Sequence, residues 1–124
     1  MKSRVSSVLV CCLVAVAQAQ TPAEQKIAWA KAAIQKDPAS AQPYTDLAAA
    51  LVRRAREAAD PSNYLQAEEA LKKSFAREPQ NFEGRKVQVS ILLGRHEFAQ
   101  ALEQAKVLNR LVPDRKSTRL NSSH

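Results

Sequence analysis

The sequence predicts an all-α protein of about five helices, and three observations carry that prediction. First, Ala, Leu, Gln, Glu, Lys and Arg dominate the 124 residues, and these residues lose least free energy on entering a helix. Second, only 2 Gly and 5% aromatic residues argue against an all-β domain, while 45% hydrophobic residues argue against a disordered chain. Third, apolar residues recur at helical spacing in segments that short polar breaks separate.

The first helix is expected to begin after Thr21 and to stop at Pro38. Thr21 can cap its amide groups, Pro22 suits the first helical position, and Glu24 can reach back to the cap amide. The second helix is expected over about 41–58. Their apolar stripes are Ile27, Ala30 and Ile34 in the first helix and Tyr44, Leu47, Ala48 and Leu51 in the second.

Three further helices follow, each between residues that start or stop a helix. Asp60-Pro61 caps and starts the third, which ends near Pro79. Asn81 can cap the fourth, which ends at Gly94, and the fifth stops at Pro113. Their apolar residues are Tyr64, Ala67, Leu71 and Phe75 in the third, Val87, Val89, Ile91 and Leu92 in the fourth, and Phe98, Ala101, Leu102, Ala105, Leu108 and Leu111 in the fifth.

A repeat of 34 residues relates the stretch 61–80 to 95–114. The matched pairs are Tyr64 with Phe98, Gln66 with Gln100, Ala67 with Ala101, Glu69 with Glu103, Lys72 with Lys106 and Pro79 with Pro113. A period of 34 residues is one helix–turn–helix unit. The repeat therefore predicts helical hairpins that stack on one another.

These residues resemble the tetratricopeptide-repeat (TPR) family. Its first-helix pattern is met by Tyr44, Leu47, Ala48 and Leu51, and its second-helix pattern by Tyr64, Ala67 and Pro79 and by Phe98, Ala101 and Pro113. The resemblance implies a short right-handed solenoid of antiparallel helix pairs over 20–113. Seven extra residues around 56–63 indicate a longer second helix and a wider turn. Arg85 and Gln88 depart from the family pattern, so the repeat register over 82–101 stays open.

Residues 1–19 are predicted to be a secretory signal peptide. Lys2 and Arg4 form its basic start, and an apolar run follows over 5–16. The small-x-small pattern at 17–19 suits a signal peptidase, so cleavage is expected after that segment. The apolar run is shorter than the ~20 residues that span a bilayer, which argues against an anchor. We therefore expect an exported protein, in the periplasm or outside a bacterial cell.

Residues 114–124 resemble no protein motif and look like the translation of a sequencing-library adapter. We interpret this tail as a disordered artefact, so the helical region is expected to be truncated. The formal charge of +7 depends on both ends of the chain. Over 20–113, 14 Lys and Arg oppose 11 Asp and Glu. That balance is typical of an ordinary surface and does not predict a nucleic-acid partner.

No catalytic, cofactor or metal site is predicted, so we expect a protein that is not an enzyme. Cys11 and Cys12 both lie in the signal peptide, which leaves the mature chain without a thiol. His96 has no second His or Cys outside the tail and is expected in a solvated turn. Glu68 and Glu69 face different directions on a helix and are expected to pair with Lys72 and Lys73 respectively.

Trp29 lies two positions from Ile27 and so off the apolar stripe of the first helix. We expect it to pack under the second helix with Ala33. The alternative is an exposed side chain that anchors a partner, because tryptophan combines a large apolar ring with one N–H donor.

The leading functional hypothesis is a non-enzymatic scaffold that binds a peptide or protein in a concave groove. The groove residues expected from the TPR register are Gln42, Thr45, Ala49 and Val52 in one unit and Glu83, Lys86, Ser90 and Leu93 in the next. The alternative is the N-terminal arm of a larger exported enzyme, such as a protease or a cell-wall hydrolase. No membrane insertion is expected after signal cleavage. Self-association through the truncated end is a further expectation, because the fifth helix is rich in leucine.

Overall fold

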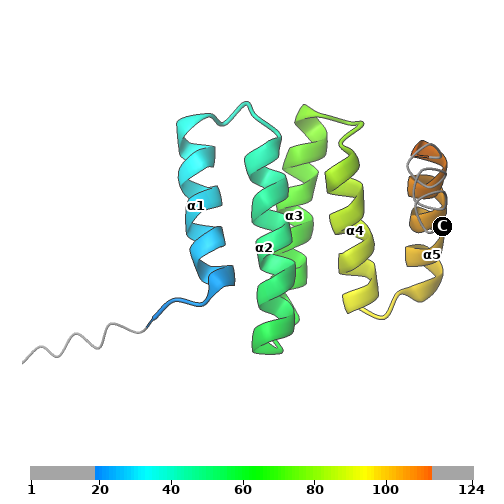
Figure 1. Ribbon diagram of the computed structural model, residues 1–124, viewed down its shortest axis with the longest axis horizontal. Coiled ribbons are helices and arrows are strands. Elements are labelled where there is room, and N and C mark those ends of the chain that lie inside the picture. Colours follow the sequence, from blue (N-terminus) through cyan, green and yellow to red (C-terminus); the bar gives the residue numbers. More distant parts are fainter. Residues whose placement is uncertain (1–18, 113–124) are drawn as a thin grey trace, which may run out of the picture.

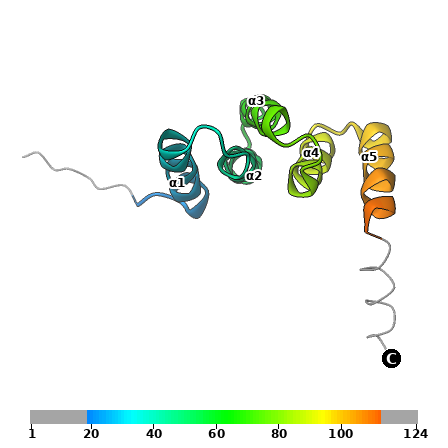
Figure 2. The same cartoon turned by 90° about the horizontal axis from the view of Figure 1, so that it is seen from above.

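The computed structural model describes residues 19–112, which form five α-helices and no strand. The helices are α1 (Pro22–Lys36), α2 (Gln42–Ala58), α3 (Ser62–Arg77), α4 (Phe82–Gly94) and α5 (Phe98–Leu111). They lie side by side in sequence order; α1 to α4 alternate in direction (Figure 1), whereas α5 is inclined steeply to α4 (Figure 2). The all-α prediction is confirmed. The predicted tail at 114–124 and all of the predicted signal peptide except Ala19 lie outside the described residues.

Two helix starts carry the caps that the sequence predicts. The Thr21 hydroxyl accepts from the Glu24 N–H at 3.2 Å, and the Thr21 N–H donates to the Glu24 carboxylate at 3.0 Å. At the start of α4, the Asn81 side-chain oxygen accepts from the Gly84 N–H at 3.0 Å. Each bond satisfies an amide that the first turn of a helix leaves without an intrahelical partner.

The turn between α2 and α3 is shorter than expected. α2 is the longest helix, with 17 residues, as predicted, but the wider turn is wrong because only residues 59–61 separate α2 from α3. The seven extra residues lengthen the α2–α3 hairpin through its helices and not through its turn. Ala59 ends α2 in the left-handed conformation, with φ 52°. Asp60 then accepts hydrogen bonds from the Ser62 N–H at 3.0 Å and the Ser62 hydroxyl at 2.7 Å, which close the turn just before α3.

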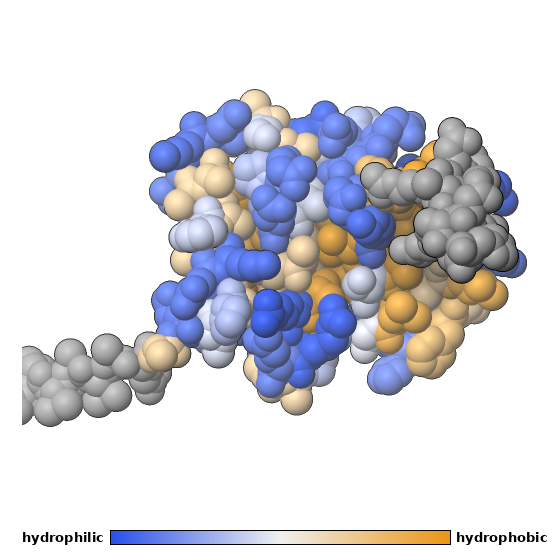
Figure 3. Space-filling model, viewed as in Figure 1, coloured by the Kyte–Doolittle hydropathy of each residue, from blue (hydrophilic) through white to orange (hydrophobic). Residues whose placement is uncertain are grey.

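α2 is the central helix of the array, because it contacts α1, α3 and α4. α4 in turn contacts α3 and α5. Seen from above, α2 and α4 lie on one side of the array and α3 on the other (Figure 2). The region of α4 and α5 shows the most apolar surface on the face in Figure 3, whereas α1 and α2 are mostly hydrophilic there.

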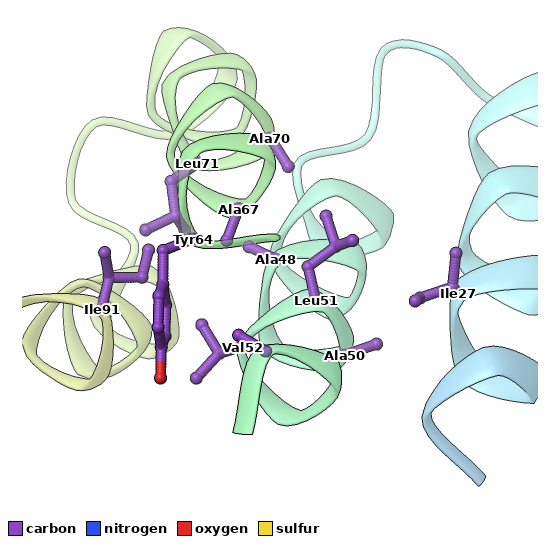
Figure 4. Packing of buried hydrophobic residues seen from close by; sticks show 11 residues of the cluster. Ile27, Ala48, Ala50, Leu51, Val52, Tyr64, Ala67, Ala70, Leu71 and Ile91 are labelled. Carbon is purple, nitrogen blue, oxygen red and sulfur yellow. The ribbon is translucent and has the colours of Figure 1, made fainter. Parts of the chain in front are cut away.

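The core lies between α2 and its three neighbours. Ala48 of α2 and Ala67 of α3 face each other, and both are 0% exposed (Figure 4). Such small side chains let two helices approach closely. On the other side of α2, Ile27 of α1 points toward Leu51. The buried cluster comprises Ile27, Ala48, Ala50, Leu51, Val52, Ala55, Tyr64, Ala67, Ala70, Leu71 and Ile91.

Gly94 ends α4 where the helix meets the aromatic ring of Tyr64. A Cβ atom at this position would overlap the Tyr64 ring and hydroxyl, so only glycine fits without a shift. Its φ is not positive; the left-handed residue of the α4–α5 turn is His96, with φ 64°. Gly94 therefore serves close packing, whereas His96 makes the turn.

None of the helices in residues 19–112 combines the length and the apolar character that a membrane crossing needs.

Candidate functional site

The four groove residues predicted on α2 divide into two exposed and two buried side chains. Gln42 and Ala49 are exposed. Thr45 and Val52 are each only 2% exposed, so the prediction that they line a groove is wrong. Val52 is buried because α2 contacts both α3 and α4. Its side chain faces the ring of Tyr64 from α3, and Ile91 of α4 lies on the far side of that ring (Figure 4).

Thr45 is buried because it belongs to a polar cluster that joins three elements. Its hydroxyl lies 2.7 Å from the Ser74 hydroxyl of α3 and accepts from the Asn81 side-chain amide at 2.7 Å. Asn81 also donates to the Ser74 hydroxyl at 2.8 Å. Asn81 could be predicted as a helix cap, but its amide partners come from α2 and α3, which no local pattern reveals.

The four groove residues predicted on α4 lie at or near the surface. Glu83, Lys86 and Leu93 are exposed, and Ser90 is half-buried. The Lys86 ammonium group pairs with the Glu83 carboxylate at 3.0 Å, and the Ser90 hydroxyl donates to the Lys86 carbonyl at 3.3 Å. These polar groups therefore satisfy one another along α4.

A cleft of about 620 Å³ lies between α1 and α2. Its lining residues are Lys26, Trp29, Ala30 and Ala33 of α1 and Asp46, Ala49, Ala50 and Arg53 of α2. Both sets follow a helical spacing of three or four residues, so one face of each helix forms one wall. Ala49 is the predicted groove residue that lies in this cleft.

Trp29 forms part of one wall of the cleft, yet its side chain stays in solvent. It is 79% exposed, so the expected packing under α2 is wrong and the alternative of an exposed side chain holds. The buried stripe of α1 consists of Ala23, Ile27 and Ala30, and Trp29 lies beside that stripe. Within residues 19–112, α2 is the one helix that α1 contacts, so no other described helix covers the indole. The sequence signal for this exposure is the offset of two positions between Ile27 and Trp29, which places Trp29 off the apolar stripe of α1.

The two ends of the cleft carry opposite charges. Lys26 lies near the start of α1, and antiparallel packing brings Arg53, near the end of α2, to the same end of the cleft. Asp46 lies at the other end, where its carboxylate accepts from the Gln42 side-chain amide at 2.8 Å. Arg53 also pairs through Nε with Glu57 at 2.6 Å.

The side chains considered for catalysis lie elsewhere and make surface contacts. His96 is exposed in its turn, and its ring meets Phe98 edge-on at 5.6 Å. Glu68 binds Arg95 at 2.7 Å, so the expected pair with Lys72 is wrong. Glu69 binds Lys72 at 2.9 Å instead of Lys73, and this contact lowers the pKa of Glu69.

The lining of the cleft combines an exposed indole, alanine methyl groups, and charges at both ends. Such an arrangement can hold an apolar side chain and orient the polar groups beside it. Within residues 19–112, no group of three His, Cys, Asp or Glu side chains is placed to bind a metal ion. No protein-family model, no curated protein and no solved structure matches this chain.

Proposed function

We propose that the protein is a non-enzymatic interaction scaffold that binds a peptide or a segment of another protein in the α1–α2 cleft. The observation that carries the proposal is Trp29, 79% exposed beside a cleft of about 620 Å³. Exposing an indole to water is unfavourable, and tryptophan is enriched among the residues that dominate binding energy at interfaces. The exposed residues of α4 predicted for the groove, Glu83, Lys86 and Leu93, extend the candidate surface.

We further propose that the helices form a short right-handed solenoid of the tetratricopeptide type. The repeat of 34 residues supports this, as does the position of α2 and α4 on one side of the array (Figure 2). The residues that carry the family resemblance on α2 and α3 include Tyr44, Ala48, Tyr64 and Ala67, all of them buried. In such arrays, the first helices of successive units line the surface that binds partners.

Export to the periplasm or the exterior of a bacterial cell is part of the same proposal. It is supported by the basic start, the apolar run and the small-x-small pattern that ends at Ala19. Amino-terminal sequencing of the secreted protein should begin at Gln20. Recovery of the chain in the cytoplasm with Met1 intact would contradict export.

A selection from a library of random peptides tests the binding function. We expect enriched peptides that bind the wild-type chain and lose at least about tenfold in affinity on Trp29→Ala, because an interface hot spot contributes 2 kcal/mol or more. Leu65→Ala is the matched control, since Leu65 is a 58% exposed hydrophobic residue on α3, outside the cleft. This variant should bind within about twofold of the wild type. Equal binding by the wild type and Trp29→Ala would contradict the proposal.

A further inference from the structure

The walls of the α1–α2 cleft constrain the backbone conformation of whatever fills it. Both walls are α-helices, whose backbone N–H and C=O groups already bond within their own helix. An extended peptide would find no partners there for its own backbone groups, and leaving such groups unpaired costs free energy. A helical segment satisfies its own backbone and presents only side chains. The cleft therefore favours a helix over a strand.

The length of the cleft suits two turns of a docked helix. Its lining spans Lys26 to Ala33 on α1 and Asp46 to Arg53 on α2. Seven steps of 1.5 Å give about 10 Å along each wall. Apolar side chains at positions i, i+3 or i+4, and i+7 of a helix cover the same distance on one face. The apolar centre of the cleft, with Trp29, can receive that stripe.

The charges at the two ends fix the direction of the docked helix. Lys26 and Arg53 lie at one end, and Asp46 lies at the other. The Glu57 carboxylate pairs with Nε of Arg53. The other N–H groups of the Arg53 guanidinium can donate to a second carboxylate. Helices commonly carry acidic residues in the first turn and basic residues in the last, as their dipole favours.

We infer that the partner segment is an amphipathic helix with acidic residues in its first turn and basic residues in its last turn. Its amino-terminal end lies beside Lys26 and Arg53, and its carboxyl-terminal end lies beside Asp46. The docked helix therefore runs parallel to α1 and antiparallel to α2. This inference rests on the proposed function and adds the chemistry and the orientation of the partner.

The test uses two synthetic peptides of identical composition, each about four helical turns long and free of tryptophan. One peptide has acidic residues in its first turn and lysines in its last, and the other has the two reversed. Trp29 is the single tryptophan of the chain, so its fluorescence reports on the cleft directly. Affinities are measured for the wild-type chain, for Lys26→Glu combined with Asp46→Lys, and for Lys31→Glu. Lys31 is an exposed lysine on α1 that does not line the cleft, which makes it the matched control.

We expect the wild-type chain to prefer the peptide with the acidic first turn. In the charge-swapped chain, the ratio of the two dissociation constants should shift by at least about fivefold toward the reversed peptide. One exposed ion pair contributes up to about fivefold in affinity, and the swap reverses the charge at both ends of the cleft. Lys31→Glu should leave the ratio unchanged. Comparing ratios cancels the different intrinsic helicities of the peptides. Thermal melting checks that all three chains fold.

A ratio that the charge swap leaves unchanged would overturn the inferred orientation. If both peptides still quench or shift Trp29 fluorescence, binding in the cleft stands and the proposed function survives. If neither peptide changes that fluorescence, the amphipathic helix is the wrong partner and the inference falls. The random-peptide selection then decides the proposed function independently.

Discussion

The α2–α3 pair and the α1–α2 pair differ in what fills the space beside their alanines. Between α2 and α3, Ala48 and Ala67 meet and are both fully buried. Between α1 and α2, Ala30 and Ala50 are buried, but Ala33 is only half-buried and Ala49 is exposed. Small residues therefore bring helices together in both places. A closed core forms only where further elements cover the contact, and a cleft forms where they do not.

The polar contacts of the two pairs differ in the same way. α2 and α3 share the buried Thr45–Ser74 contact, which Asn81 completes. α1 is joined to α2 by a more exposed ion pair between Glu24 and Arg54 at 3.5 Å, which salt screens. The α2–α3 pair with the start of α4 thus forms the frame of the molecule, and α1 adds the wall that makes the cleft.

The largest expected effect comes from placing the same bulky side chain at each contact. Ala67→Trp should destabilise the fold by about 3 kcal/mol, because the closed α2–α3 contact has no room for an indole. Ala49→Trp should change stability by less than about 0.5 kcal/mol, because that position opens into the cleft. Urea unfolding measures both. Equal losses at the two positions would mean that the α1–α2 pair is as closed as the α2–α3 pair.

A smaller effect is expected from the polar cluster. Asn81→Ala should cost about 1–2 kcal/mol, since it removes the cap of α4 and the amide that binds the two buried hydroxyl groups. Asn109→Ala on the exposed surface of α5 is the control and should change stability little. Chemical denaturation of the two variants gives the comparison. Matching midpoints for Asn81→Ala and the wild type would show that the cluster does not stabilise the frame.

The smallest effect concerns the α2–α3 turn and depends on pH. Hydrogen bonds from the Ser62 hydroxyl and N–H hold the pKa of Asp60 below its ordinary value of 3.8. The stability from this carboxylate is therefore present above that value and is lost as the pH falls through the lower, folded-state pKa. Between about pH 6 and about pH 3, the wild type should lose more stability than Asp60→Asn. Identical losses in the two proteins would contradict this role for Asp60.

Most of the helix boundaries could be predicted from the sequence because local residues determine them. Thr21 and Asn81 cap their helices through bonds within the next three residues, and Pro38 and Pro79 cannot continue a helix. The turn after α2 was harder to predict. The end of α2 at Ala58 agrees with the predicted range of 41–58, but Ala59 makes the turn in a left-handed conformation that alanine rarely takes.

The candidate site could be predicted only in part, because exposure depends on which helices lie beside one another. Ala49, which the sequence predicts to face a groove, is exposed and lines the cleft. Thr45 and Val52 flank the apolar stripe of α2, and contacts with α3, Asn81 and α4 bury them. Trp29 shows the reverse case: an apolar residue stays exposed since α2 is the one described helix that α1 contacts.

Hydrogen exchange with a selected peptide tests most directly the claim that a partner binds between α1 and α2. Amide exchange is measured for the wild-type chain with and without the peptide, and Trp29→Ala serves as the control. We expect slower exchange in 26–33 and 46–53 on binding, no change in 98–111, and no slowing in the Trp29→Ala chain. Slowing centred on α4 and α5, or slowing that persists in Trp29→Ala, would contradict the claim.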